Sequence, residues 1–368
     1  MKTRLLAALA TALLSGAALA VTVAPAPAGQ VAGPALPMRI GGRVAFVTEG
    51  VAKGVRRQWP GTYFETAFTG TAALLTVGPG NVVLRVRVDD APAIRLFKPA
   101  PGRYRIGDLP AGPHRVRVDV ASESQAGPTI FGGFQSVDGA SPLTLPTRTR
   151  RIEFIGDSHT VGYANLSTKR DCSEAEVWDS TDTSQGIAPR TAARYDADYR
   201  VNAISGRGVV RNYDGGLADT LPTAYPFLLF DKAERDATRW HPQLIVIALG
   251  TNDFTTALHP GEKWANRDAL HADYETRYRS FIRTLRKRDP QAHILIWATD
   301  MANGEIAAEA GKVVERIRKA GDRHITFMPV NGLAMSSCHA HPSTADDSII
   351  ADRIAAYVDA HPDLWGKK

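Results

Sequence analysis

Residues 152–158 read IEFIGDS, a compact apolar run that ends at a glycine, an aspartate and a serine. Four later runs share this compact apolar character: residues 199–204, 244–249, 294–298 and 325–328. Helical spacing of apolar residues marks three stretches between or after these runs: residues 274–285, 307–317 and 346–358. Strands that alternate with helices in this way favour a parallel sheet covered on both faces by helices. Residues 148–368 are therefore predicted to form a three-layer α/β/α domain.

Residues 38–147 show a different pattern, with short runs that are cut by turn residues. Residues 114–120, HRVRVDV, alternate polar and apolar side chains with a period of two, as a half-buried strand does. Helical spacing is nearly absent from this part of the sequence. We therefore predict an antiparallel β-sandwich, a jelly roll or a similar fold, ahead of the α/β domain.

The N-terminus has the features of an export signal. Lys2 and Arg4 precede an apolar run at residues 5–14, and residues 18–20 form an A-x-A cleavage pattern. Residues 1–20 are thus predicted to be a cleaved signal peptide, and the mature protein to be secreted or periplasmic. Residues 21–37 are rich in Ala, Pro and Gly and are predicted to be a flexible leader. No stretch is long and apolar enough for stable membrane insertion to be expected.

The composition narrows the range of partners and cofactors. The formal net charge of +6 is modest and the arginines are spread along the chain, which gives weak support for an acidic polymer partner and little for nucleic acid. Cys172 and Cys338 are the two cysteines, and they are expected to pair in an oxidising compartment. Neither these cysteines nor His339 and His341 belong to a cluster that completes a metal site. No metal and no organic cofactor are expected.

Three residues at predicted strand ends are candidates for chemistry. Ser158 follows the first strand of the α/β domain, Gly206 the second and Asn252 the third. Reactive groups of parallel sheets collect at the carboxyl ends of strands, where N–H groups or an amide can stabilise an anion. Each residue also has a purely structural interpretation, because serine is a common helix cap and glycine and asparagine are common in turns. Gly208 is nearly as good a candidate as Gly206.

His341 lies just before the last predicted helix. Its imidazole, with an ordinary pKa near neutrality, is a natural base for a serine hydroxyl. The chain has ten histidines, so a surface role is the simpler interpretation when any one of them is taken alone.

Together, the three strand-end loops and the late histidine resemble the motif blocks of the SGNH or GDSL hydrolases. This resemblance implies a flavodoxin-like SGNH hydrolase domain in which Ser158 is the nucleophile and His341 is the base. It also implies that Ser158, Gly206 and Asn252 form the oxyanion hole, which stabilises negative charge on the attacked carbonyl.

A closer resemblance is to carbohydrate esterase family two, whose members place a jelly-roll domain before the SGNH domain. Residues 151–163, RIEFIGDSHTVGY, are similar to the entry motif of that family. Cys338, followed by HPS at residues 341–343, is similar to its last block. The two-domain order extends the likeness across nearly all of the mature protein.

The last block departs from the common pattern in one respect. An aspartate commonly stands three residues before the histidine, or in family two often two residues before it, but these positions hold Cys338 and His339. A Ser158–His341 dyad is therefore expected, in which a backbone carbonyl can hold the imidazole N–H. A disulfide through Cys338 is expected to stiffen the loop that carries His341.

Loop aromatic residues are candidates for a sugar site, because their rings stack on pyranose faces. Trp178, Tyr213 and Trp264 are the candidates, with plain packing as the alternative for each. Trp297 lies in an apolar strand and is expected in the core.

The expected function is the removal of O-acetyl groups from acetylated carbohydrate, such as acetylxylan or a related polysaccharide or oligosaccharide, by a secreted serine esterase. Three alternatives stay open. One is a general short-chain carboxylesterase or lipase, and another is an O-acetyl esterase of peptidoglycan or exopolysaccharide. The third is a glycan-binding protein whose enzyme site has decayed, which the missing carboxylate keeps open.

Overall fold

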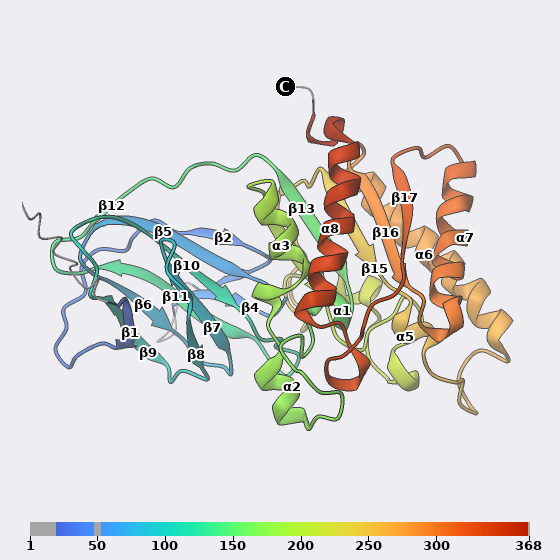
Figure 1. Cartoon of the computed structure of the whole chain (residues 1–368), viewed down its shortest axis with the longest axis horizontal. Coiled ribbons are helices and arrows are strands. Elements are labelled where there is room, and N and C mark those ends of the chain that lie inside the picture. The colour runs from blue at the N-terminus through green and yellow to red at the C-terminus, as the bar shows by residue number, and fades with distance from the viewer. Residues whose placement is uncertain (1–19, 48–52, 367–368) are drawn as a thin grey trace, which may run out of the picture.

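The computed structural model describes residues 20–47 and 53–366. Within these ranges the chain forms a β-sandwich followed by an α/β domain (Figure 1), which confirms the predicted fold class. Except for its last residue, the predicted signal peptide lies outside the described residues and stays a prediction. No helix in the described part of the chain is long and apolar enough to cross a membrane.

The sandwich consists of two antiparallel sheets. The first has the order β1 (Thr22–Pro25), β9 (Gly102–Gly107), β6 (Ala73–Val77), β11 (Thr129–Ser136), β4 (Gly54–Arg57) and β3 (Ala45–Val47). The second has the order β12 (Ser141–Pro142), β5 (Tyr63–Gly70), β10 (Gly112–Val120), β7 (Val83–Val88) and β8 (Ile94–Phe97), with β2 (Arg39–Gly41) also paired to β5.

The alternation read from the sequence gives each sheet one buried face. In β10, Val116 and Val118 are buried in the core between the sheets, whereas Arg115 is exposed. Phe64 of β5 and Phe131 of β11 stack across this core, with ring centroids 4.2 Å apart. Burial of such side chains is the main source of stability for a sandwich of this kind.

The prediction of a flexible leader is wrong for the start of residues 21–37. Thr22–Pro25 forms strand β1, which pairs antiparallel with β9 at the edge of the first sheet. Val21 and Val23 pack against the sandwich core. An edge strand needs backbone partners on one side only and tolerates proline, so the composition of this segment conceals its pairing.

The α/β domain is built on a parallel five-stranded sheet. Its order is β14 (Asp198–Ala203), β13 (Arg151–Gly156), β15 (Leu244–Ala248), β16 (His293–Thr299) and β17 (Ile325–Val330). In this flavodoxin-like order the chain reverses direction across the sheet beside its first strand, and that is where crevices open at the strand ends. Ser158, Gly206 and Asn252 follow three adjacent strands, β13, β14 and β15.

Helices cover both faces of this sheet (Figure 1). Helices α3 (Ile187–Arg194) and α8 (Thr344–Ala360) pack together on one face, and α6 (Arg267–Arg288) and α7 (Glu305–Lys319) pack on the other. Successive strand residues point to opposite faces. Val246 of β15 therefore packs in the core beneath α3 and α8, whereas Ile245 and Ile247 pack in the core beneath α6 and α7. Trp297 of β16 is buried in the core beneath α3 and α8, as predicted.

Short helices connect these elements and lie near the strand ends. They are α1 (Ser158–Val161), α2 (Glu174–Ser180), α4 (Leu221–Ala224), α5 (Thr251–Phe254) and the 3₁₀ turns η1 (Thr183–Gln185), η2 (Tyr213–Gly215), η3 (Ala302–Gly304), η4 (Cys338–Ala340) and η5 (Pro362–Trp365).

The sandwich packs tightly against the α/β domain. Trp59 is fully buried in a core cluster of the α/β domain, and its Nε1–H donates to the carbonyl oxygen of Phe227 at 3.0 Å. Glu123 lies just after β10, and its Oε1 atom accepts the N–H of Ser205 at 2.8 Å. The sandwich therefore contributes directly to the loop that follows β14.

Candidate active site

Ser158 lies where β13 passes directly into helix α1. Glycine is required at position 156, because a Cβ atom there would lie 2.0 Å from the Oγ1 atom of Thr160. The helix cap is Asp157, whose Oδ1 atom accepts the N–H of His159 at 3.1 Å. Ser158 is thus the first helical residue rather than the cap, and its side chain makes no capping hydrogen bond.

Ser158 and His341 are in hydrogen-bond contact. The Nε2 atom of His341 lies 2.9 Å from the Oγ atom of Ser158, and its Nδ1 atom lies 3.0 Å from the carbonyl oxygen of Cys338. A carbonyl oxygen can only accept, so Nδ1 carries the proton and Nε2 accepts the Ser158 hydroxyl. The pair therefore has the groups of a nucleophile and a base, with a carbonyl where a carboxylate is more usual.

The surroundings of His341 favour its neutral form. Burial lowers the pKa of His341 to about 4, and the hydrogen bond to the carbonyl of Cys338 offsets only part of this effect. The ring centroid of Tyr163 lies 4.3 Å from that of His341, and the centroid of His159 lies 5.5 Å from it. Burial also lowers the pKa of His159 to about 3. At neutral pH the imidazole of His341 is uncharged and can accept a proton.

Asn252 lies on α5, beyond the end of β15, and its amide reaches the turn that carries Ser158. The Nδ2 atom donates to the carbonyl oxygen of Arg207 at 2.9 Å and to Oδ2 of Asp157 at 3.3 Å. Asp157 precedes Ser158 directly, so the amide lies beside the serine, as its strand-end position predicts. The longer of the two contacts is the weaker one, and a stronger acceptor near Ser158 can replace it.

The structure favours Gly206 over Gly208 as a backbone donor. Gly206 has a φ of +80°, and a Cβ atom there would meet no heavy atom within 4 Å, so the space beside it is open. Within the described residues its N–H has no hydrogen-bond acceptor. Gly208 instead donates to Oδ1 of Asn212 at 3.3 Å, and a Cβ atom at Gly208 would lie 2.1 Å from a carbonyl oxygen. Gly208 is needed for packing, whereas the N–H of Gly206 is available.

Asp253 shapes the segment that follows Gly206, a role not predicted from the sequence. Its buried carboxylate accepts the N–H groups of Val209, Val210 and Arg211 at 2.9, 2.9 and 3.0 Å. Burial raises the pKa of Asp253 to about 6 and that of Asp157 to about 7, and the charge of Asp253 adds to the rise at Asp157. Asp253 directly follows Asn252, but its partners lie more than forty residues away in sequence.

A disulfide and several hydrogen bonds fix the position of the loop that carries His341. Cys172 and Cys338 form the predicted disulfide. Arg170 donates to the carbonyl oxygens of Ala334 and Met335 at 2.9 and 2.8 Å. The N–H of His339 donates to the carbonyl oxygen of Arg170 at 2.7 Å. The backbone carbonyl that holds His341 therefore belongs to a disulfide-linked residue.

A cavity of about 450 Å³ lies near this group of residues, although neither Ser158 nor His341 is part of its lining. It is lined by both domains, with Glu123 from the sandwich and Tyr163 and Trp178 from the α/β domain. Tyr163 packs against His341, and Ser205, which precedes Gly206, also lines the cavity. The cavity volume is in the range that small ligands occupy.

The three aromatic candidates differ in where the structure places them. Trp178 lines the cavity, and its ring meets that of Phe97 at 5.5 Å. Tyr213 is 57% exposed, and its N–H donates to the carbonyl oxygen of Gly206 at 2.9 Å, so it lies at the strand ends. Trp264 packs against the core of the α/β domain and donates to Asp273 at 3.1 Å, and it does not line the cavity. The geometry thus favours Trp178 and Tyr213 over Trp264.

No group of three or more His, Cys, Asp or Glu side chains in the described ranges could hold a metal ion. The chemistry that this arrangement supports is transfer of an acyl group through a serine, with a histidine base and nearby N–H donors.

Two family models match the chain. The model of the carbohydrate esterase 2 N-terminal domain matches residues 40–146, and that of the GDSL-like lipase/acylhydrolase family matches residues 154–366. An acetylxylan esterase / glucomannan deacetylase of Cellvibrio japonicus (strain Ueda107) is 40% identical over 335 residues, which are 90% of this chain and 92% of that protein. The cellulase/esterase CelE of Acetivibrio thermocellus is 27% identical over 83% of this chain, a region that makes up 37% of that protein.

Solved structures of carbohydrate esterases also match the chain. A carbohydrate esterase whose active site is described as displaying divergent catalytic and non-catalytic binding functions matches with a TM-score of 0.86 and 38% identity, over 90% of this chain and 100% of that one. A family two carbohydrate esterase from Clostridium thermocellum, in complex with cellohexaose, matches with a TM-score of 0.77 and 26% identity, over 89% of this chain and 100% of that one.

Proposed function

The chain belongs to carbohydrate esterase family two, and on that premise we propose that it releases acetate from O-acetylated carbohydrate by means of Ser158 and His341. Membership of this family makes the protein a carboxylic ester hydrolase. The observation that supports the proposed dyad is the 2.9 Å contact between Nε2 of His341 and Oγ of Ser158, with Nδ1 on a backbone carbonyl.

In the first half of the reaction, the Oγ atom of Ser158 bonds to the ester carbonyl carbon while Nε2 of His341 takes the hydroxyl proton. The electron pair of the carbonyl moves onto its oxygen, which the N–H groups of Ser158 and Gly206 and the amide of Asn252 stabilise. When the carbonyl re-forms, the sugar oxygen leaves with the proton from His341. An acetyl group remains on Ser158.

In the second half, water attacks the acetyl carbonyl and gives its proton to His341. Acetate leaves and Oγ of Ser158 regains the proton, so the enzyme returns to its starting state. The carbonyl oxygen of Cys338 accepts the Nδ1–H throughout, which keeps the ring in one tautomer. A carbonyl stabilises the imidazolium less than a carboxylate does, because it offers a dipole rather than a full charge.

The substrate that we propose is an acetylated plant-type polysaccharide or an oligosaccharide derived from it. The names of the relatives, acetylxylan esterase and glucomannan deacetylase, support this class. The cavity that Tyr163 and Ser205 line offers the ring of Trp178 for stacking and the carboxylate of Glu123 for sugar hydroxyls. Secretion after removal of residues 1–20 fits a polymer that cannot enter a cell.

Two of the alternatives are less well supported by these observations. A lipase needs a long apolar channel, whereas the cavity is lined by Glu123, Glu174 and Gln125 as well as by apolar side chains. A decayed glycan-binding site has no need to keep a histidine at hydrogen-bond distance from a serine. Deacetylation of peptidoglycan or exopolysaccharide uses the same chemistry and differs only in the acceptor.

Acetate release from a panel of esters tests the proposal. The mature chain is compared on acetylated xylan, acetylated glucomannan, O-acetylated peptidoglycan and a long-chain acyl ester. We expect the acetylated plant polysaccharides to give the highest kcat/KM. Faster cleavage of the long-chain ester or of peptidoglycan would contradict the proposed substrate class, and no cleavage of any ester would contradict the proposed activity.

A further inference from the structure

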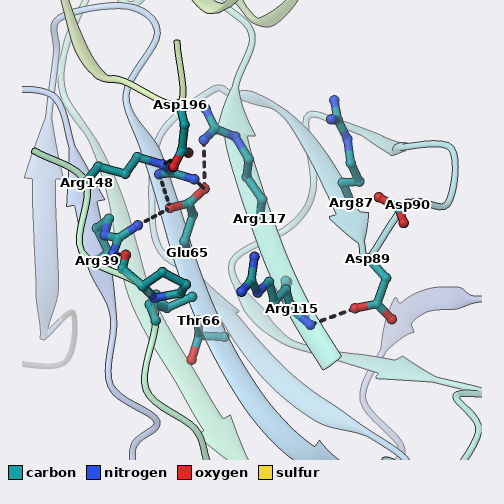
Figure 2. Close-up of a pocket in the computed structure, with 13 residues that line it drawn as sticks. Arg39, Glu65, Thr66, Arg87, Asp89, Asp90, Arg115, Arg117, Arg148 and Asp196 are labelled. Carbon is teal, nitrogen blue, oxygen red and sulfur yellow. Dashed lines mark hydrogen bonds and ion pairs between the residues drawn. The ribbon is translucent and has the colours of Figure 1, made fainter. Parts of the chain in front are cut away.

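A second cavity, of about 370 Å³, lies on the sandwich (Figure 2). Its walls come from β2, β5, β7 and β10, from the segment that leads into the α/β domain, and from Asp196. Five arginines line it, against four carboxylates. None of these residues belongs to the site around Ser158, so the reaction proposed above leaves this cavity without a role.

Three of the five arginines are already paired. The carboxylate of Glu65 receives Arg117 at 2.9 Å and Arg148 at 2.6 Å, with Arg39 at 3.3 Å (Figure 2). Arg148 also binds Asp196, at 2.9 Å. These contacts join the sandwich to the α/β domain and account for the burial of Glu65. Structural pairing therefore explains this half of the cavity.

The remaining two arginines, Arg87 and Arg115, are exposed and form no salt bridge within the described part of the chain. Asp89 is no partner for either guanidinium, because it binds the ring of His114 at 2.7 Å. It also accepts the backbone N–H of Arg115 at 2.8 Å (Figure 2). Arg87 and Arg115 are therefore the two arginines of the cavity without a bound carboxylate, and Asp90 lies on the same wall.

Strand register places Arg87 and Arg115 close to the paired guanidinium of Arg117. Arg87 of β7 stands directly opposite Arg117 of β10, and Arg115 lies two residues from Arg117 on the same face of β10. Opposed like charges on antiparallel strands destabilise a sheet. Arg117 is neutralised by Glu65 and by Asp119, which lies 2.7 Å from it, so binding of an anion in the cavity is left to the guanidinium groups of Arg87 and Arg115.

An adjoining cavity extends this surface. It has a volume of about 390 Å³, shares Arg87 and Arg117 with the first, and is also lined by Arg190. Two joined cavities lined by arginine suit a chain of sugar units that carries a carboxylate better than they suit a single small ion. Guanidinium groups bind carboxylates through paired hydrogen bonds, and the exposed carboxylate of Asp90 can receive sugar hydroxyls.

We propose that Arg87 and Arg115 form a binding site on the sandwich for the carboxylate of an acidic saccharide. The choice of a saccharide over other carboxylates rests on the proposed function, because a carbohydrate esterase meets such chains as its substrates. The site holds a uronate substituent of the polymer while acetyl groups elsewhere on the chain reach Ser158. It adds affinity for acidic glycans and takes no part in ester cleavage.

Calorimetry with a matched pair of ligands tests the site. The ligands are a xylo-oligosaccharide that carries one glucuronate and the same oligosaccharide without it, with inorganic sulfate as a third probe. The mature Ser158→Ala protein is used so that no turnover occurs. We expect about tenfold tighter binding of the acidic oligosaccharide, and we expect Arg87→Gln/Arg115→Gln to remove this difference without weakening the neutral ligand.

The matched control is Arg103→Gln/Arg283→Gln, which removes the same charge at two exposed positions outside both cavities. Equal affinity for the two oligosaccharides, or an equal loss in the control, would overturn the proposal. Sulfate bound as tightly as the acidic oligosaccharide would overturn the assignment to a saccharide.

Thermal unfolding separates a binding role from a structural one. A binding role predicts an unchanged or higher Tm for Arg87→Gln/Arg115→Gln, because the substitution relieves repulsion, and a lowered Tm would contradict it. Binding is measured without turnover, so it can succeed in a protein that releases no acetate. The carboxylate-binding site and the proposed esterase activity can therefore be contradicted independently of each other.

Discussion

The carbonyl oxygen of Cys338 takes the place at His341 where an aspartate is more common. This substitution changes the charge beside the ring but not its orientation, because Nδ1–H still has one fixed acceptor. Burial then makes protonation of His341 unfavourable, and the neighbouring rings of Tyr163 and His159 add no negative charge to oppose this. The base is therefore neutral well into the acidic range.

This low pKa predicts an unusual acid limb in the pH profile. Because the base must be neutral and its pKa is lowered to about 4, titration of His341 should change kcat/KM on a soluble acetyl ester little between pH 7 and pH 5. The profile is repeated in Asp253→Asn, because the pKa of Asp253 is raised to about 6 and its protonation falls in the same range. A histidine with an ordinary pKa of about 6.5 would instead lose roughly thirtyfold at pH 5. The measurement is the pH dependence of kcat/KM, with circular dichroism at each pH.

The lowered pKa of His341 also makes the stability of the fold depend on pH. The pKa of His341 is lower in the folded than in the unfolded state, so protonation favours unfolding, and this part of the stability is lost as the pH falls from about 6.5 toward 4. An acid limb centred near pH 6.5 that persists in a folded Asp253→Asn protein would contradict the account of His341.

For single residues, the sequence predicts which side chains carry the chemistry better than it predicts which residues hold them in place. Ser158, His341 and the carbonyl partner of the ring lie as the motif order suggests, because strand ends and the last loop converge in this topology. The contacts of Asp253 could not be predicted in the same way. These contacts join a side chain to the backbone of a distant segment. Every residue except proline has a backbone N–H, so the sequence does not indicate which of these groups a carboxylate binds.

Among the elements, the loop that carries His341 depends on the Cys172–Cys338 disulfide. We predict that Cys172→Ser/Cys338→Ser lowers kcat by about tenfold, because Cys338 supplies the carbonyl that orients the ring. Unfolding is monitored in parallel, since loss of a native disulfide typically costs about 2–5 kcal/mol. Unchanged kcat in the double variant would show that Arg170 and the backbone contacts suffice to hold the loop.

Helix α5 carries both the amide of Asn252 and the carboxylate of Asp253. Removing that carboxylate in Asp253→Ala should release the segment after Gly206 and lower kcat by about a hundredfold, with little effect on KM, because an oxyanion donor is misplaced. Asp253→Asn should recover part of this loss. Its Oδ1 can still accept the N–H groups of Val210 and Arg211, while the third bond is lost.

The control for this experiment is Asp268→Ala, which removes an exposed carboxylate at the start of α6. If Asp253→Ala raised KM at constant kcat, or if Asp253→Asn were as slow as Asp253→Ala, the positioning role of Asp253 would be wrong.

Strand β1 shows where element prediction from sequence fails. The sandwich strands with clear alternation, such as β10, were predictable because burial of every second side chain is what stabilises them. Strand β1 is exposed along most of its length and is held by backbone pairing to β9. A four-residue edge strand that ends in a proline has too little side-chain burial to leave a pattern.

For the whole molecule, the tight packing between the domains predicts that they unfold together. Trp59→Ala should lower the free energy of unfolding by about 3–5 kcal/mol, because it removes a fully buried ring and its hydrogen bond to the α/β domain. Phe46→Ala is the control, since that ring is 73% exposed on the sandwich. The measurement is denaturant unfolding followed by two probes.

Two separate transitions in the parent protein, or a loss below about 1 kcal/mol in Trp59→Ala, would contradict tight coupling of the domains. Coupling also has a functional side, because Glu123 of the sandwich holds the backbone of Ser205 beside the proposed oxyanion hole. The sandwich is thus part of the active-site structure as well as the location of the arginine-lined cavity.

The central claim is that Ser158, with His341 as its base, performs the deacetylation. Its most direct test is the initial rate of acetate release from acetylated xylan by the mature protein and by Ser158→Ala, at equal concentration and with matched circular dichroism. We predict that the variant is slower by at least about a thousandfold, because no other group can accept the acetyl group. Equal rates from the two proteins would contradict the account.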